Sequence, residues 1–162
     1  MGVELIPKDT LGLAAEFAVA SELCRRGIYA QLTLGNRKRT DLLVDVENGQ
    51  MFRLQVKAKQ KQAWPGVKGV SGPSIVLVLV DYEKKELVER PDFYVLTPSD
   101  WKAFINVQLV KPGKVKDGKV SLNEDLVPTF KDGWVGMSVR PEQVRKYRER
   151  WEKIIKAVKR AP

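Results

Sequence analysis

The chain has 162 residues, of which 43% are hydrophobic and 30% charged, and it carries a formal net charge of +9. These proportions are typical of one soluble domain that can bury a core of its own. The sequence contains no histidine and one cysteine, which excludes His-based nucleophilic catalysis, His- or Cys-ligated zinc and an internal disulfide framework. Any catalysis must therefore come from carboxylates, lysine, tyrosine or a hard metal ion held by oxygen ligands.

The start of the chain and its longest apolar run predict the compartment. The first residues lack the order of basic, apolar and small residues that marks a signal peptide. The longest apolar run, residues 75–80, is too short to cross a bilayer. We expect a cytoplasmic protein without a membrane partner.

Hydrophobic periodicity and turn residues predict the elements. Asp9 or Thr10 can cap a first helix, and Gly27 can end it. Asn48-Gly49 is a strong hairpin signal between two strands. In chain order we expect a helix to about 26, strands over 28–34, 40–46 and 51–58, a Pro/Gly-rich loop over 60–73, strands over 74–81 and 93–96, a helix over 97–106, a hairpin turn at 116–119, a strand over 134–139 and a helix over 141–159.

This order predicts a single α/β domain over 1–162, with a core over about 9–106 and a C-terminal β region and helix over about 107–162. The last helix is amphipathic, and its polar faces are mostly Lys and Arg. Residues 140–160 hold nine Lys/Arg and three Glu, a net charge of +6. That charge favours a polyanion partner. It could instead keep the protein soluble or serve assembly.

The predicted hairpin gathers polar side chains. With Asn48-Gly49 as its turn, Asp41 should lie opposite Val56, with a tolerance of one or two residues. Alternation along the second strand puts Gln55 and Lys57 on the same face. A carboxylate, an amide oxygen and an ammonium group are therefore expected within a few ångströms of one another.

Glu16 is unusual in the predicted first helix. Its neighbours three and four residues away are small or apolar: Gly12, Leu13, Val19 and Ala20. A carboxylate on a packing face is costly unless a metal ion, a lysine or a backbone donor compensates it. The alternative is a helix edge where Glu16 reaches water. Glu22, by contrast, has Arg25 and Arg26 within reach, so we expect a solvated ion-pair partner.

Three motifs follow one another in the order found in a known family. They are Gly12-Leu13-Ala14-Ala15-Glu16 in the first helix, Thr40-Asp41-Leu42-Leu43-Val44 on a strand, and Leu54-Gln55-Val56-Lys57 on its hairpin partner. Together they resemble the PD-(D/E)XK nuclease superfamily, most closely its Mrr-like and archaeal Holliday-junction-resolvase-like branches, in a Gln-X-Lys variant. The resemblance implies a restriction-endonuclease-like core, in which helices flank a central mixed β-sheet, followed here by the basic C-terminal helix.

The resemblance also implies an activity, that of a Mg²⁺- or Mn²⁺-dependent endonuclease or resolvase-like phosphodiesterase on DNA, and a possible homodimer. Asp41 would be the principal metal ligand, with Gln55 giving its side-chain oxygen and Val56 its carbonyl. Lys57 would orient or deprotonate the attacking water, and Glu16 would be an outer or direct ligand. Because Gln55 stands where most members have an acid, weaker Mg²⁺ binding is expected. The alternative is a catalytically silent nuclease-fold module that binds nucleic acid or a protein partner.

Basic residues near this predicted site are expected to bind phosphates. Arg37, Lys38 and Arg39 directly precede Asp41, although a solvated basic turn is the alternative. Lys59 shares the strand face of Lys57 and is included in the predicted nucleic-acid contacts.

The aromatic residues and the cysteine are less informative. Trp64, in a Pro-Gly context, could stack on a base or pack over the sheet. Trp101 and Phe104 are expected to anchor their helix, and Cys24 is expected to be a small core residue.

Overall fold

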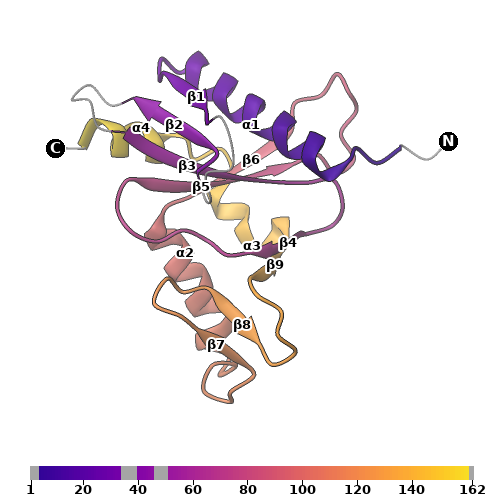
Figure 1. The fold of residues 1–162 in the computed structure, drawn as a ribbon, viewed down its shortest axis with the longest axis vertical. Helices are drawn as coiled ribbons and strands as arrows, with labels where there is room; N and C mark the ends of the chain where they lie inside the picture. The colour runs from indigo at the N-terminus through magenta and orange to yellow at the C-terminus, as the bar shows by residue number, and fades with distance from the viewer. Residues whose placement is uncertain (1–3, 34–39, 46–50, 161–162) are drawn as a thin grey trace.

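A computed structural model describes residues 4–33, 40–45 and 51–160 of the chain (Figure 1). The helices are α1 (Lys8–Arg25), α2 (Pro98–Ile105), α3 (Pro141–Val144) and α4 (Glu152–Arg160). The strands are β1 (Ala30–Leu32), β2 (Leu42–Asp45), β3 (Met51–Lys59), β4 (Trp64–Val67), β5 (Ile75–Asp81), β6 (Asp92–Leu96), β7 (Val120–Leu122), β8 (Pro128–Phe130) and β9 (Met137–Val139). Among the described helices, none has the length and apolar character needed to span a membrane.

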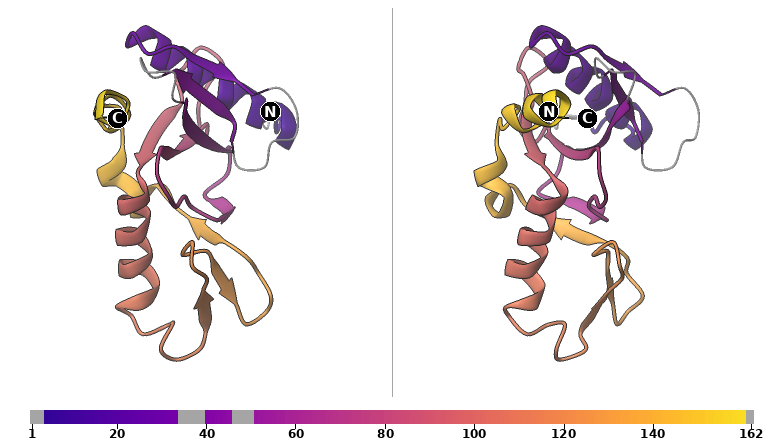
Figure 2. Two further views of the ribbon diagram at one scale, coloured as in Figure 1. Left: turned by 60° about the vertical axis from the view of Figure 1, so that its left-hand side comes forward. Right: turned by 90° about the vertical axis from the view of Figure 1, so that its left-hand side faces the viewer.

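Five strands form the central sheet, in the order β1-β2-β3-β5-β6. Strands β3 and β5 are parallel, and the other neighbouring pairs are antiparallel. Every residue of β5 is buried, as its unbroken apolar run predicts. Helices cover the sheet on both sides (Figures 1 and 2). The predicted fold class, a central mixed sheet flanked by helices, is therefore confirmed.

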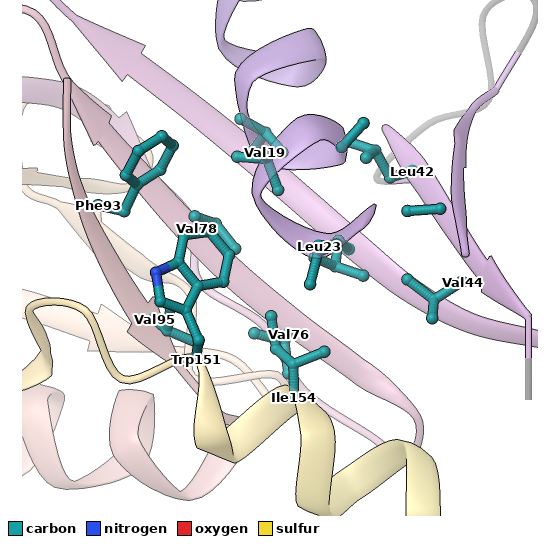
Figure 3. Packing of buried hydrophobic residues seen from close by; sticks show 14 of the residues in the cluster. Val19, Leu23, Leu42, Val44, Val76, Val78, Phe93, Val95, Trp151 and Ile154 are labelled. Carbon is teal, nitrogen blue, oxygen red and sulfur yellow. The ribbon is translucent and has the colours of Figure 1, made fainter. Parts of the chain in front are cut away.

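Two hydrophobic clusters lie on opposite faces of the sheet, because successive side chains of a strand point to opposite faces. On one face, Val76 and Val78 of β5 pack with residues of α1 and α4. Figure 3 shows Val19 and Leu23 of α1 and Trp151 and Ile154, near and on α4, gathered over this face. On the other face, Leu77 and Leu79 of β5 pack with α2, β4 and β9.

The predicted C-terminal helix over 141–159 is wrong in one respect, because it is interrupted. Helix α3 passes into a 3-10 turn at Arg145–Tyr147, and α4 begins only at Glu152. Between them Glu149 has a φ of 55°, and its N–H donates to the carbonyl of Phe93 on the edge strand β6. The break has a packing reason. Tyr147 belongs to one hydrophobic cluster and Trp151 to the other, so the segment has to cross the sheet edge.

The predicted loop over 60–73 is also wrong in part, because it contains β4. Strand β4 pairs with β9, with Trp64 opposite Val139 and an irregularity before Val67. The hairpin turn predicted at 116–119 precedes β7 instead of joining two strands, and the β7–β8 hairpin turns over 123–127. Helix α2 and the β7–β8 hairpin project together from the sheet (Figure 2).

Candidate functional site

Strand β3 runs on past its partner β2. Strand β2 pairs with β3 from Asp45↔Met51 to Leu42↔Leu54. On its other side β3 continues to pair with β5 as far as Lys59↔Asp81. The far half of β3 therefore has an open edge among the described strands, and a cavity of about 850 Å³ lies beside it. The walls of this cavity are the first half of α1, the end of β3 and the start of β4.

Asp41 lies at the start of β2, where the open edge begins. Its N–H donates to the carbonyl of Leu54 at 2.9 Å, and its Oδ2 accepts a hydrogen bond of 2.7 Å from the N–H of Val56. The observed register pairs Leu42 with Leu54, one residue away from the predicted register. The side chain of Asp41 nevertheless reaches Val56, because a carboxylate extends past its own backbone position.

Glu16 and Lys57 also contribute to the walls of this cavity. Burial raises the pKa of the Glu16 carboxyl, and the negative charge of Asp41 raises it further. The Lys57 ammonium lowers the pKa of Glu16 in part, so all three charges lie within electrostatic range of one another. Lys57 itself is exposed. The structure thus brings together Glu16, Asp41, Val56 and Lys57, four of the residues that the sequence predicted.

Gln55 lies apart from this group. It is 6% exposed, and the register puts it beside Leu77 of β5. Its side-chain amide forms no hydrogen bond with another described residue, and it does not contribute to the cavity wall. Gln55 is therefore buried next to β5 and stands outside the cavity wall, although it directly precedes Val56.

The oxygen donors at the cavity determine which metal ion the residues fit. Within the described part of the chain, no group of three or more His, Cys, Asp or Glu side chains is arranged to hold a metal ion. The cavity wall includes the carboxylates of Asp9, Glu16 and Asp41, together with Val56, and Glu16 and Asp41 are the two acids that interact electrostatically. Two carboxylates without nitrogen or sulfur ligands fit a hard cation such as Mg²⁺, which keeps several of its waters and needs few protein ligands. They do not fit a closed structural zinc site.

The phosphate-binding role predicted for Lys59 does not fit its surroundings. Its side chain is 1% exposed, and its Nζ lies 2.6 Å from Asp81 Oδ1 and 2.9 Å from Glu83 Oε2. Nζ also donates to the carbonyl of Lys61 at 2.9 Å. These acceptors occupy the ammonium and compensate its charge. Lys59 therefore ties the ends of β3 and β5 together.

Two lysines that the sequence did not single out also contribute to the cavity wall. Lys8 lies at the start of α1 and Lys61 just after β3. Both are exposed, and neither forms an ion pair with another described residue. Lys61 could have been predicted from the sequence, because it continues the alternation of Lys57 and Lys59 by two residues. Lys8 carried no such local signal.

Arg37, Lys38 and Arg39 lie outside the described residues, as does the predicted Asn48-Gly49 turn. Their predicted contributions therefore stay predictions.

Three other predictions have clear outcomes. Trp64 is 1% exposed and its Nε1 donates to the carbonyl of Val80 at 3.1 Å, so it packs against the sheet. Trp101 and Phe104 are buried, which confirms them as anchors of α2. Cys24 is exposed, so its assignment to the core was wrong.

Comparison with known proteins gives little independent information. Neither a protein-family model nor a curated protein sequence matches the chain. Among solved structures the chain is similar to a bacterial homing endonuclease, I-Ssp6803I, at 20% identity over 93% of each chain, with a TM-score of 0.46. Because both values are low, the function of this chain has to be inferred from the geometry of its cavity.

Proposed function

We propose that the protein is a Mg²⁺-dependent endonuclease that hydrolyses phosphodiester bonds in DNA. The observation that carries this proposal is the meeting of Glu16, Asp41 and Lys57 at the open edge of β3. There, burial and a second carboxylate raise the pKa of Glu16. Two acids with one lysine in a cavity form a constellation that can bind a cation and promote hydrolysis.

Each of these cavity residues would have a different role in hydrolysis. Asp41, whose Oδ2 is oriented by the N–H of Val56, would be the principal ligand of the ion, with Glu16 as the second carboxylate. The bound ion would activate a water molecule and neutralise charge on the scissile phosphate. The Lys57 ammonium would orient that water by donating a hydrogen bond, and its charge would stabilise the negative charge that develops on the phosphate. Gln55, which is buried on the same strand, would support this arrangement or offer its side-chain oxygen.

The lysines of the cavity support a polyanionic substrate. Lys8, Lys57 and Lys61 are exposed along one cavity, and the whole chain carries a net charge of +9. Phosphate contacts of this kind favour binding through the release of counterions. A resolvase-like enzyme of the Mrr-like or archaeal resolvase-like type is the finer form of the proposal. A homodimer would supply the two sites that cutting both strands requires.

The proposal is tested by variants that each remove the charge of one cavity residue. Asp41→Asn keeps an oxygen acceptor for the N–H of Val56, and Lys57→Ala removes the ammonium. We expect each to lower the cleavage rate in Mg²⁺ about 100- to 10,000-fold, while DNA binding persists. Asp45→Asn and Arg53→Ala are matched controls. They change exposed residues at the other ends of β2 and β3, and should retain activity.

A second candidate, a silent nuclease-fold module that binds nucleic acid or a protein partner, is favoured by one observation. Gln55 supplies no negative charge and does not contribute to the cavity wall. If the wild type cuts no duplex, junction, flap or single strand with Mg²⁺ or Mn²⁺, this module becomes the better description. If DNA binding is also absent or insensitive to salt, both nucleic-acid functions fail.

A further inference from the structure

One tryptophan differs from the others in exposure. The chain has four tryptophans, and Trp64, Trp101 and Trp151 are each at most 3% exposed. Trp134 is 52% exposed. It lies in the connection between β8 and β9. A half-exposed indole leaves a large apolar face in water, where it can take up a flat partner.

Trp134 lies against the β4 wall of the cavity. A Cβ atom built on Gly66 would be 3.7 Å from Cζ2 of the Trp134 ring, so the indole lies beside this glycine. Gly66 itself contributes to the cavity wall. Close packing fixes this position, because a Cβ on Gly136 would come within 2.6 Å of the backbone of Gly66. The ring therefore stands at the rim of the cavity that holds Glu16 and Asp41.

The backbone that carries Trp134 is held on several sides. The Trp134 N–H donates to Asp132 Oδ1 at 3.0 Å, and its carbonyl accepts from the N–H of Phe130 at 2.9 Å. The next residue, Val135, forms a β-bridge with Thr129. An exposed aromatic ring on an ordered backbone can bind a flat ligand without a large ordering cost.

We infer that Trp134 is a base-stacking platform, on which an unpaired base of the bound nucleic acid lies against the exposed face of the indole. The inference rests on the proposed function. Phosphates held by Lys8, Lys57 and Lys61 would bring a strand past Gly66 and the ring beside it. A base can stack on a side chain only when it is out of the duplex. The preferred substrate class therefore carries unpaired nucleotides next to the scissile phosphate, as in a flap, a junction or a single strand.

The test compares binding of a fully paired duplex and of the same duplex with a single-stranded extension, at one salt concentration. One stacked base contributes about 1–3 kcal/mol. Trp134→Ala should therefore weaken binding of the extended duplex about 5- to 150-fold and leave the fully paired duplex nearly unchanged. Trp134→Phe should restore most of the affinity. In the wild type, the extended duplex should quench tryptophan fluorescence, and Trp134→Phe should abolish the quenching. Leu87→Ala, at a fully exposed apolar residue, is the matched control.

The outcomes separate this inference from the proposed function. If Asp41→Asn loses cleavage while Trp134→Ala binds both substrates like the wild type, the nuclease stands and the stacking platform fails. If no substrate is cut but Trp134→Ala selectively loses the extended duplex, the platform stands and the nuclease fails. If Trp134→Ala instead changes the oligomeric mass without changing DNA binding, the residue is a protein contact and the inference is overturned.

Discussion

Two glutamates on the same helix, Glu16 and Glu22 of α1, have opposite electrostatic surroundings. The Glu22 side chain is only 7% exposed. It accepts hydrogen bonds of 2.9 and 2.8 Å from Arg90, and a further hydrogen bond from Arg26. The hydrogen bonds from Arg90 and then from Arg26 lower the pKa of the Glu22 carboxyl to about 2. The pKa of Glu16 is raised instead, by burial and by the charge of Asp41.

The difference indicates which of the two glutamates has its charge balanced by basic residues of the protein. Around Glu22 the basic partners come from the protein itself, and Glu149 extends the network by accepting from Arg90 at 2.7 Å. Around Glu16 the charge of a second carboxylate, Asp41, is only partly offset by Lys57, so these three side chains are not balanced among themselves. A pair of carboxylates whose charge the protein only partly balances is the one suited to bind a cation from outside. The Glu22 cluster stabilises the fold, whereas the Glu16 cluster is the candidate site.

The largest effect on stability is expected for Glu22→Gln, which tests the contrast between Glu22 and Glu16. The substitution keeps the shape but removes the charge between Arg26 and Arg90. We expect the free energy of unfolding at neutral pH to fall by about 2–3 kcal/mol, below the 3–5 kcal/mol of a fully buried pair because Arg90 is partly exposed. Urea unfolding measures it. Glu86→Gln, at an exposed glutamate without an ion pair to a described residue, should change stability by no more than about 0.5 kcal/mol. An equal loss of unfolding free energy in the two variants would contradict the conclusion that the Glu22 cluster stabilises the fold.

The second prediction concerns pH. Because the pKa of Glu22 falls from 4.5 to about 2 on folding, its stabilisation is fully present above pH 4.5 and is lost as the pH falls towards 2. The gap in unfolding free energy between the wild type and Glu22→Gln should therefore shrink by about 2 kcal/mol between about pH 6 and pH 2.5. Urea unfolding along a pH series measures this gap. A constant gap would show that the charge of Glu22 does not stabilise the fold.

Glu22 also shows what limited prediction from the sequence. Its local partners Arg25 and Arg26 were predicted from their spacing. Its burial was not, because Arg90 comes from 68 residues away along the chain. The prediction of a solvated pair was wrong for that reason. Lys59 is a second case, since its partners come from another strand: Asp81 is the last residue of β5, and Glu83 lies just after it. The burial of an ionic group depends on remote partners that local spacing does not specify.

The hairpin was more predictable because its signals are local. Alternation along β3 and the position of Asp41 before β2 predicted that Asp41 and Lys57 meet, and the observed register differs by one residue, within the stated tolerance. The pairing of β4 with β9 joins segments about 70 residues apart and left no local pattern. As a result, the Pro-Gly context of Trp64 left both base stacking and packing over the sheet open. In the structure, Gly66 instead allows close packing against Gly136.

The smallest effect on stability is expected for Glu16→Gln, and its sign tests whether Glu16 and Glu22 differ. Because the pKa of Glu16 is raised, its ionised form costs stability at neutral pH, and the cost disappears as the pH falls below 4.5. In metal-free buffer Glu16→Gln should therefore raise the free energy of unfolding by less than about 1 kcal/mol, the opposite sign to Glu22→Gln on the same helix. Thermal unfolding, first with a chelator and then with Mg²⁺ or Mn²⁺, measures the difference in stability between Glu16→Gln and the wild type under both conditions.

The sign of this difference should depend on the cation. A cation that binds only the folded wild type stabilises it in proportion to the logarithm of the cation concentration. Glu16→Gln, with one carboxylate fewer beside Asp41, should gain less, so its advantage should shrink or reverse as Mg²⁺ or Mn²⁺ is added. If Glu16→Gln is destabilising even with the chelator, then Glu16 is held by the protein as Glu22 is. The contrast between the two glutamates of α1 would then no longer identify the site.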